Sequence, residues 1–482
     1  MVSLPESGRS TAEILAEVAA LRSRDLPTHG GKLFAYVYDA AVPGLDDLAL
    51  RAHGLAASTN GLDPTAFPSL LRMENDIVAA AASLLGGDDT AGSLTSGGTE
   101  SVLLAVKAAR DARPDVTAPR IVLPSSAHPA FAKAGAYLKV ALDVVPVDPA
   151  TLRVSPSAIE EAIGPDTVLV VASAPAYPHG VVDPVTEIAA AAAAKNVRCH
   201  VDACFGGWIL PFWRDLGVAG EPFDFSVPGV TSVSVDLHKY AYCPKGVSVL
   251  LHRTAALREP QYFGYAGWPG YGVVNATVAS TRAGGPIAAA WAVLQHLGRD
   301  GYRSLAGSAL AATRGLADAV RAVPPLALLV DEPESPVVAF RSDDPAVDVF
   351  VLADELAAQG WHIQPQMSFA GIGRTAHLTV TAAVEPHVTE FAGALEAAVR
   401  GSRERGPALA PFDGLDTLDP ATLTPDVVAE LAAAVGLDLT AGSPTNGTAM
   451  INAVLDAAPV PVREKLLVAV LDLLQRPGPA EA

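Results

Sequence analysis

Apolar residues recur at helical spacing in the first part of the chain and in strand-like runs further on. The spacing predicts a leading helix over Thr11–Ser23 and a second helix over Arg72–Leu85, separated by an irregular stretch rich in Gly, Pro and Asn. The continuous apolar run Thr167–Ala172 is typical of a strand buried on both faces of a sheet. Other elements are expected to alternate in the α/β manner: strands at Ile121–Leu123, Val197–Val201 and Val233–Leu237, and helices at Ala127–Leu138, Asp183–Lys195 and Pro286–Leu297.

Toward the C-terminus the pattern indicates a smaller domain and a helical extension. Strands at Val337–Arg341 and His377–Thr381 flank helices, as expected of an α+β domain. Sequence rich in Pro and Gly from Gly401 to Pro411 marks a boundary, and amphipathic helices are predicted beyond it over Pro425–Val435, Gly447–Ala457 and Val462–Leu474. The expected division is an N-terminal helix and arm (1–60), a large domain (61–300), a small domain (301–405) and a helical extension (406–482) that pads a dimer.

Composition favours a large α/β enzyme. The chain has 482 residues, too many for one ordinary core, and its 50% hydrophobic but only 6% aromatic content fits Ala-, Val- and Leu-rich helices packed on a sheet. Its 33 Lys and Arg against 52 Asp and Glu give a formal net charge of −19 without any basic run. A nucleic-acid binder needs a basic stripe, so we expect no nucleic-acid partner.

Membrane and metal binding are not expected either. Met1–Ser10 has no apolar region, and no stretch approaches the ~20 apolar residues that cross a bilayer. The three cysteines, Cys199, Cys204 and Cys243, show no C-x-x-C or zinc spacing, and we interpret them as small buried residues in a reducing compartment. The chain is therefore expected to be cytoplasmic, with no metal site.

Three segments combine residue types that bind ligands. In Thr95–Ser101 two glycines precede an apolar helical run, so free amides at a helix start offer a phosphate site, although such a turn is more often only a turn. In His200–Trp208, Asp202 follows a buried strand, where an unpaired carboxylate is costly, with a helix N-cap or a salt bridge as the ordinary alternative. In Ser234–Tyr240, Lys239 follows a strand predicted to be central; a covalent link explains a buried lysine, and a solvated strand-end lysine is the ordinary alternative.

Together and in this order, the segments resemble the sphingosine-1-phosphate lyase branch of the group II decarboxylase-like family. The resemblance implies the PLP-dependent transferase fold (aspartate-aminotransferase-like, fold type I), an α/β fold with a large mixed-sheet domain that binds pyridoxal 5′-phosphate and a small α+β C-terminal domain. The matching stretches are TSGGTES at Thr95–Ser101, HVDACFGG at His200–Gly207, SVDLHKYAYCPKG at Ser234–Gly246, FPSLLRMENDIV at Phe67–Val78 and, more weakly, ATVASTRAGG at Ala276–Gly285.

The resemblance also implies which residues bind the cofactor. Lys239 resembles the Schiff-base lysine and Asp202 the partner of the pyridine nitrogen. His128 resembles the histidine that stacks on the ring, with a helix-start histidine as its ordinary alternative, and His238 would contact the phosphate or its neighbour Lys239. The phosphate would be held by Gly97, Gly98 and Thr99 and, from a neighbouring subunit, by Ser280 and Thr281, which implies a homodimer with shared sites.

The residues expected at the substrate include two departures from the family pattern. Tyr38 resembles an active-site tyrosine and is a candidate proton handler, while Lys245 would favour an anionic substrate group or remain a solvated loop lysine. The family commonly reads Asn-Pro-Leu-His-Pro, and the corresponding segment of this chain is Asn60-Gly61-Leu62-Asp63-Pro64. Asp63 therefore stands in place of the histidine that the resemblance implies at the substrate phosphate. A carboxylate about 4 Å from a substrate phosphate is repulsive by about 1 to 4 kcal/mol. His179 likewise replaces a tyrosine.

The sequence is therefore interpreted as a PLP-dependent carbon–carbon lyase with Lys239, Tyr38 and His238 as its catalytic residues. It would cleave a β-hydroxy amine or a phosphorylated sphingoid-base-like substrate to an aldehyde and an amine by a retro-aldol reaction. The alternative is an amino-acid α-decarboxylase, for which Arg374 is the candidate carboxylate ligand. A third possibility is a non-catalytic relative that binds a partner; the intact pair of Asp202 and Lys239 argues against it.

Overall fold

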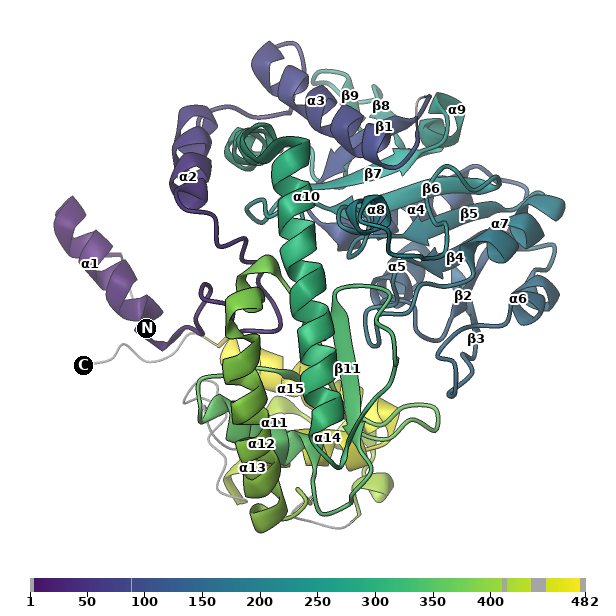
Figure 1. Ribbon diagram of the computed structural model, residues 1–482. Coiled ribbons are helices and arrows are strands. Elements are labelled where there is room, and N and C mark those ends of the chain that lie inside the picture. The colour runs from purple at the N-terminus through teal and green to yellow at the C-terminus, as the bar shows by residue number, and fades with distance from the viewer. Residues whose placement is uncertain (1–3, 88, 410–413, 435–447, 477–482) are drawn as a thin grey trace.

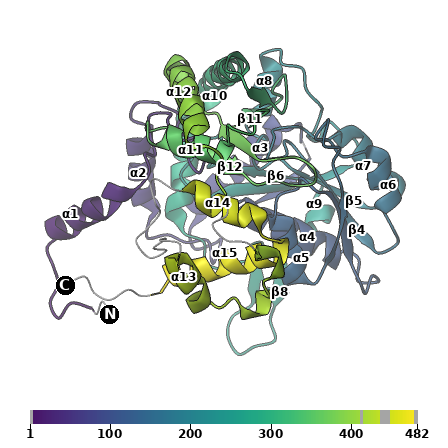
Figure 2. The ribbon, with the colours of Figure 1, turned by 90° about the horizontal axis from the view of Figure 1, so that it is seen from below.

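Two sheet-containing domains lie along a long helix, α10 (Gly284–Ala322), in the computed structural model (Figure 1). The structure describes residues 4–87, 89–409, 414–434 and 448–476. The large domain contains the sheet formed by residues before α10, and the small domain contains the sheet formed after it. Helices near the C-terminus lie against the small domain (Figures 1 and 2).

The large domain is built on a seven-stranded mixed sheet with the order β1-β7-β6-β5-β4-β2-β3. Strand β7 runs antiparallel to both of its neighbours, whereas the pairs among β2 to β6 are parallel. The strands are β1 (Ala91–Thr95), β2 (Arg120–Pro124), β3 (Ala141–Val145), β4 (Thr167–Ser173), β5 (Arg198–Asp202), β6 (Val230–Asp236) and β7 (Ser248–His252).

Helices cover both faces of this sheet. Their apolar residues form one buried cluster with α4 and α5 on one face and a larger cluster with α3, α6, α7 and α8 on the other. Burial on both faces explains why β4 is apolar without alternation. The helices are α3 (Pro68–Leu84), α4 (Gly98–Asp111), α5 (Ala130–Leu138), α6 (Pro156–Ala162), α7 (Val185–Ala194) and α8 (Leu210–Asp215).

The small domain has a four-stranded antiparallel sheet with the order β10-β11-β13-β12. The N-terminal arm contributes to its core, because Phe34 is fully buried against Trp361 and Phe391, with ring centroids 5.9 and 5.1 Å away. The elements are β10 (Leu326–Leu328), β11 (Val337–Ser342), β12 (Gln364–Gln366), β13 (Thr375–Thr379), α11 (Val349–Ala357) and α12 (Val388–Arg405).

Helix α10 connects the two cores across a break at Gly298. This glycine has a φ of 55°, a left-handed conformation that a side chain would disfavour. Val293 and Leu305 pack in the large-domain core, whereas Leu316 and Val320 pack in the small-domain core. One helix therefore links both domains.

The C-terminal helices α13 (Pro425–Ala434), α14 (Thr448–Ala457) and α15 (Val460–Leu474) form a small core of their own, which includes Val428, Val462 and Leu466. Helix α14 also packs on α11 (Figure 2). Ala449 and Ala453 of α14 form a buried cluster with residues of α11. Within the described ranges, each helix is too short or too polar to cross a bilayer.

The helix predicted at the start of the chain and the strands predicted from apolar runs are confirmed, whereas the interpretation of the stretch before Pro68 as irregular is wrong. Helix α2 (Leu45–Ala56) forms there, between Gly44, whose φ is 78°, and a turn, with Gly54 inside it. These glycines concealed its helical spacing. Strands β1, β3 and β7 were not predicted, and the predicted helix ends at Val435 and Gly447 lie outside the described residues.

Asp183 closes the loop between β4 and α7 and is fully buried. Its Oδ2 accepts a hydrogen bond from the Ser173 amide at 2.7 Å, while Oδ1 has no partner among the described residues. Burial raises the pKa of Asp183 from 3.8 to about 7, against the opposing effect of the Ser173 hydrogen bond. The folded chain therefore holds a proton that the unfolded chain releases at lower pH.

Stability is predicted to fall as pH rises through the window from about pH 4 to about pH 7, because the native state binds the additional proton there. Asp183→Asn keeps an acceptor for the Ser173 amide and removes the titration. Urea unfolding across this window should show a flatter dependence of the unfolding free energy on pH in the variant than in the parent. An equal slope in both proteins would show that Asp183 does not titrate as described.

Candidate active site

A cavity of about 480 Å³ lies at the carboxyl ends of the parallel strands, and we call it the strand-end pocket. The loops after β1, β2, β4, β5 and β6 each contribute side chains to it. Of the residues expected at the cofactor and substrate, the pocket brings together Tyr38, Gly97, Gly98, Thr99, His128, Asp202, His238, Lys239 and Lys245.

Lys239 is held at the floor of this pocket by Asp236. Its Nζ lies 3.0 Å from Asp236 Oδ2, and the two side chains are 20% and 4% exposed. Ser248 Oγ donates to Asp236 Oδ1 at 2.5 Å. Burial acts to lower the pKa of Lys239, but nearby negative groups, Asp236 foremost, outweigh it and raise that pKa. Burial acts to raise the pKa of Asp236, but the charge of Lys239, with a hydrogen bond from Ser248, holds it below its usual value, so both partners are charged.

Asp202 ends strand β5 beside Lys239 and is 8% exposed. Its Oδ1 accepts hydrogen bonds from the Cys204 amide at 3.1 Å and from Ser234 Oγ at 3.4 Å. No ion pair to it occurs among the described residues, so the salt bridge considered for this carboxylate does not form there. A buried carboxylate with this sparse set of partners is suited to a protonated ring nitrogen of a ligand.

The turn between β1 and α4 offers backbone amides at a helix start to the same pocket. A side chain at Gly98 would meet Cys204 Sγ at 2.8 Å and the Asp236 carboxylate oxygens at 2.9 Å, so only glycine fits this approach. Glu100 fixes the turn, because its Oε2 accepts from the Ser96 amide at 2.6 Å and its Oε1 from the Val278 amide at 2.7 Å. The arrangement can cradle a phosphate.

Two histidines of the pocket are held neutral. Burial lowers the pKa of His128, and the charge of Lys239 adds to this effect. His128 Nδ1 accepts from the Ala130 amide at 3.2 Å, so its proton resides on Nε2. Burial also lowers the pKa of His238, whose Nε2 lies 3.7 Å from Asp236 Oδ2.

Tyr38, which belongs to the N-terminal arm, and Lys245 also line the pocket. Burial raises the pKa of Tyr38, so its phenol stays protonated at neutral pH. Lys245 Nζ lies 5.6 Å from the centre of the Tyr38 ring and donates to the Tyr36 carbonyl at 3.0 Å. Burial and the charge of Lys239 lower the pKa of Lys245.

Four expected site residues lie together but away from this chain's own pocket. The Asn60 backbone pairs with Ala283 in a β-bridge, which places it next to the loop that contains Ser280 and Thr281. Asp63 is exposed and accepts from the Thr65 amide at 2.8 Å within its own turn. None of the four is among the residues that line the strand-end pocket.

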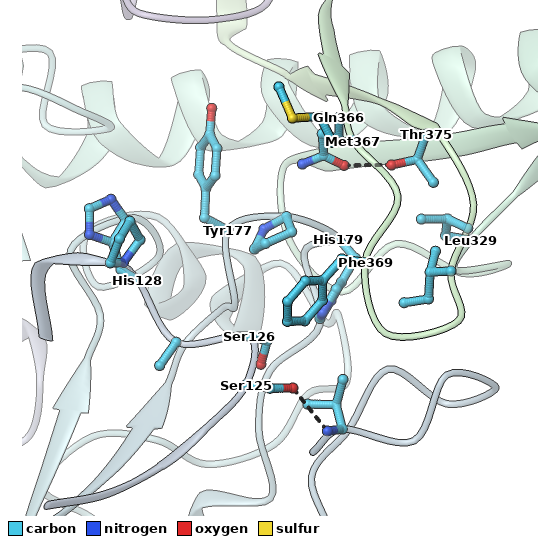
Figure 3. A pocket seen from close by; sticks show the side chains of 15 residues that line it. Ser125, Ser126, His128, Tyr177, His179, Leu329, Gln366, Met367, Phe369 and Thr375 are labelled. Carbon is cyan, nitrogen blue, oxygen red and sulfur yellow. Dashed lines mark hydrogen bonds between the residues drawn. The ribbon is translucent and has the colours of Figure 1, made fainter. Parts of the chain in front are cut away.

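His179 and Arg374 also lie outside the strand-end pocket. His179 lines a second cavity, in which Figure 3 shows it near Phe369. Arg374 donates to Asp348 Oδ2 at 2.6 Å and to Asp456 Oδ2 at 2.8 Å. Because two carboxylates already bind this guanidinium, Arg374 is unsuited to holding a substrate carboxylate.

Three residues of the site were not predicted from the sequence. Asp236 ends β6 as Asp202 ends β5, so the same rule, an acid after a buried strand, would have found it. Glu100 is buried inside the recognised TSGGTES stretch. Tyr177 lines the pocket and donates to Gln364 Oε1 at 2.6 Å, a contact that the sequence pattern does not reveal.

The chain is similar to known pyridoxal-dependent enzymes. The profile of the pyridoxal-dependent decarboxylase conserved domain matches residues 28–343, and that of a C-terminal HTH domain of pyridoxal-dependent enzymes matches residues 408–473. Sphingosine-1-phosphate lyase of Arabidopsis thaliana is 38% identical over 373 residues, which are 76% of this chain and 67% of that protein. Sphingosine-1-phosphate lyase 1 of Rattus norvegicus is 38% identical over 383 residues, 79% of this chain and 66% of that protein.

A solved structure gives the same result. The structure of Burkholderia pseudomallei sphingosine-1-phosphate lyase is 35% identical and has a TM-score of 0.79, covering 84% of this chain and 94% of that chain. The chain spans about two thirds of the length of the Arabidopsis and rat lyases. The expected fold class is confirmed.

Gly98→Ala is predicted to destabilise the cofactor-free protein by about 1 to 3 kcal/mol, because the added methyl group overlaps Cys204 and Asp236. The matched control is Gly97→Ala, since a Cβ there meets nothing within 4 Å and the φ of 167° is extended backbone. Urea unfolding measures both. Equal stability of the two variants would contradict the close approach at Gly98.

Proposed function

Because the chain belongs to the pyridoxal-dependent decarboxylase family, we propose that it is a pyridoxal-phosphate-dependent lyase that cleaves the Cα–Cβ bond of a phosphorylated β-hydroxy amine. The observation that carries this proposal is Lys239, buried against Asp236 in a pocket that also contains a phosphate-binding turn. The names of the relatives favour a sphingoid-base phosphate as substrate, with an aldehyde and a phosphorylated amine as products.

The residues of the strand-end pocket fit the cofactor. Lys239 is the residue that would hold it covalently, Asp202 would keep its ring nitrogen protonated, and neutral His128 would lie on the ring face. The Gly97–Gly98 turn, which excludes a side chain at Gly98, would receive its phosphate. When bound, pyridoxal phosphate supplies a protonated ring that withdraws electrons from the bond being broken.

The remaining side chains of the pocket would bind and orient the substrate. Tyr38, protonated at neutral pH, would donate a hydrogen bond from its Oη to the substrate. Lys245 faces the anionic group of the substrate from the same wall. His238 lies against Asp236 and helps to keep the Lys239–Asp236 pair in place.

We further propose that the active form is a homodimer. Asn60, Asp63, Ser280 and Thr281 form one group outside their own chain's pocket, joined through the Gly61 amide, which donates to the Arg282 carbonyl at 2.8 Å. A second subunit would receive Ser280 and Thr281 at its phosphate turn, with Asn60 and Asp63 further out on the substrate side. A cytoplasmic location fits the three cysteines, which are free and buried in the structure.

Cofactor-loaded protein is predicted to release an aldehyde from a phosphorylated sphingoid base, measured by hydrazone formation. Lys239→Ala should reduce this rate by more than about a thousandfold, because the group that holds the cofactor is removed. Carbon dioxide release from a panel of amino acids is measured in parallel. Carbon dioxide without aldehyde would replace the lyase assignment by an α-decarboxylase, and neither product would refute both.

A further inference from the structure

A second cavity, of about 290 Å³, adjoins the strand-end pocket, and we call it the apolar chamber. The two cavities share His128 and Tyr177 in their walls. One side of the chamber is formed by the loop after β2, and the other by Leu329 and the hairpin between β12 and β13 (Figure 3). A ligand seated at Lys239 that extends into the chamber would therefore pass these two shared side chains.

Among the described residues, the wall of the chamber carries no charged side chain. No Asp, Glu, Lys or Arg is among the residues that line it. His179 is 6% exposed, and neither of its ring nitrogens has a partner among the described residues, nor has Ser126 Oγ. Burial, reinforced by the charge of Arg153, lowers the pKa of His179 to about 4, so the ring is neutral at pH 7. An unpaired charge would be costly here, whereas a hydrocarbon group carrying a neutral polar atom fits.

The hairpin wall of the chamber consists of Met367, Phe369 and Ile372. The Phe369 and Ile372 amides each donate to the other's carbonyl at 2.9 Å, which closes the hairpin tip. At its base Thr375 Oγ1 donates to Gln366 Oε1 at 2.8 Å (Figure 3). The hairpin tip is largely exposed, since Phe369 retains 56% of its accessible surface. The position of the hairpin therefore depends on contacts with other parts of the chain.

The C-terminal helices supply those contacts through Asp456, near the end of α14. Its Oδ1 accepts from the Ser368 amide at 2.7 Å, and its Oδ2 accepts from Arg374 Nε at 2.8 Å. Asp456 thus binds the two sides of the hairpin at once. Met367 also packs against the cluster that contains Ala453 of α14.

We propose that the apolar chamber receives the uncharged hydrocarbon arm of the substrate amine, and that Asp456 of the C-terminal helices sets the shape of the chamber by fixing its hairpin wall. The identity of the amine rests on the proposed function. In this arrangement the arm would lie on the chamber side of His128, and the charged part of the substrate would stay in the strand-end pocket.

A nucleic-acid role for the C-terminal helices is disfavoured by their charge. Residues 408–473, which match the HTH profile, contain nine Asp or Glu but only two Lys or Arg. A surface that binds nucleic acid requires the opposite balance. The contacts of Asp456 assign these helices to the substrate site of their own chain instead.

The first test compares Asp456→Ala and Asp456→Asn with the control Asp472→Ala in the full-length cofactor-loaded enzyme. Asp472 lies on α15, and its Oδ2 accepts a hydrogen bond from Arg476 Nε at 3.0 Å. Asp472 makes no contact with the hairpin in the described structure. For Asp456→Ala we expect KM to rise about tenfold for a phosphorylated amino alcohol with a long hydrocarbon arm, because a charged hydrogen-bond partner is lost. KM for a short-armed analogue, kcat and the cofactor absorbance should stay within about twofold of the parent.

Equal changes in KM for both arms, or the same change in Asp472→Ala, would overturn the positioning role of Asp456. Asp456→Asn keeps an acceptor for the Ser368 amide and should lie between the parent and the alanine variant. Circular dichroism establishes that each variant is folded. The graded response then remains informative if Asp456→Ala is unstable.

The second test measures the chamber without any reaction. Dodecanol has no amino group, and its binding to the holoenzyme is followed by calorimetry. Ile372→Trp fills the chamber from the exposed hairpin tip, and dodecanol affinity should fall about fourfold for each methylene excluded. Undiminished binding in this variant would overturn the chamber even if the enzyme proves to be a lyase, whereas loss of binding supports the chamber even if aldehyde release fails.

Discussion

Lys239 and Asp236 place two opposite charges, 3.0 Å apart, at the carboxyl end of the interior strand β6. Removing one partner of such a pair costs about 3 to 5 kcal/mol, because the other charge is left buried without compensation. The surrounding structure satisfies this constraint: Ser248 binds the second carboxylate oxygen, and Gly98 leaves room for the carboxylate beside the phosphate turn. The position of the reactive amine, and with it the rest of the site, depends on this pair.

The two cavities separate charge from hydrocarbon. The strand-end pocket contains Lys239, Asp236 and Asp202, whereas charged side chains are lacking from the described wall of the apolar chamber. His128, held neutral by burial, is common to both, so it divides a polar reaction centre from an apolar recess. This division suits an amine with a charged head and an uncharged arm, and under the proposal Asp456 would connect the C-terminal helices to the chamber wall.

Much of the site could be predicted from the sequence because parallel strands bring their carboxyl ends together. Asp202 and Lys239 were expected from their places at the ends of strands, and His128 from the family resemblance; the pocket contains all three. The chamber could not be predicted, since its walls join residues such as Ser126 and Phe369 that are distant in sequence. Asp456 belongs to an amphipathic helix, and the spacing of apolar residues predicts this helix but not the hairpin that Asp456 contacts. Helix α2 was missed because the glycines in and beside it interrupt its helical pattern.

Borohydride reduction of the cofactor-loaded enzyme shows which lysine binds the cofactor covalently, and we expect that lysine to be Lys239. Reduction fixes the cofactor to its lysine, and mass spectrometry of the digested protein then locates it. We predict a pyridoxyl group on the peptide that contains Lys239, and none in Lys239→Ala. Attachment to Lys245, the other lysine that lines the strand-end pocket, or no attachment at all, would contradict the account.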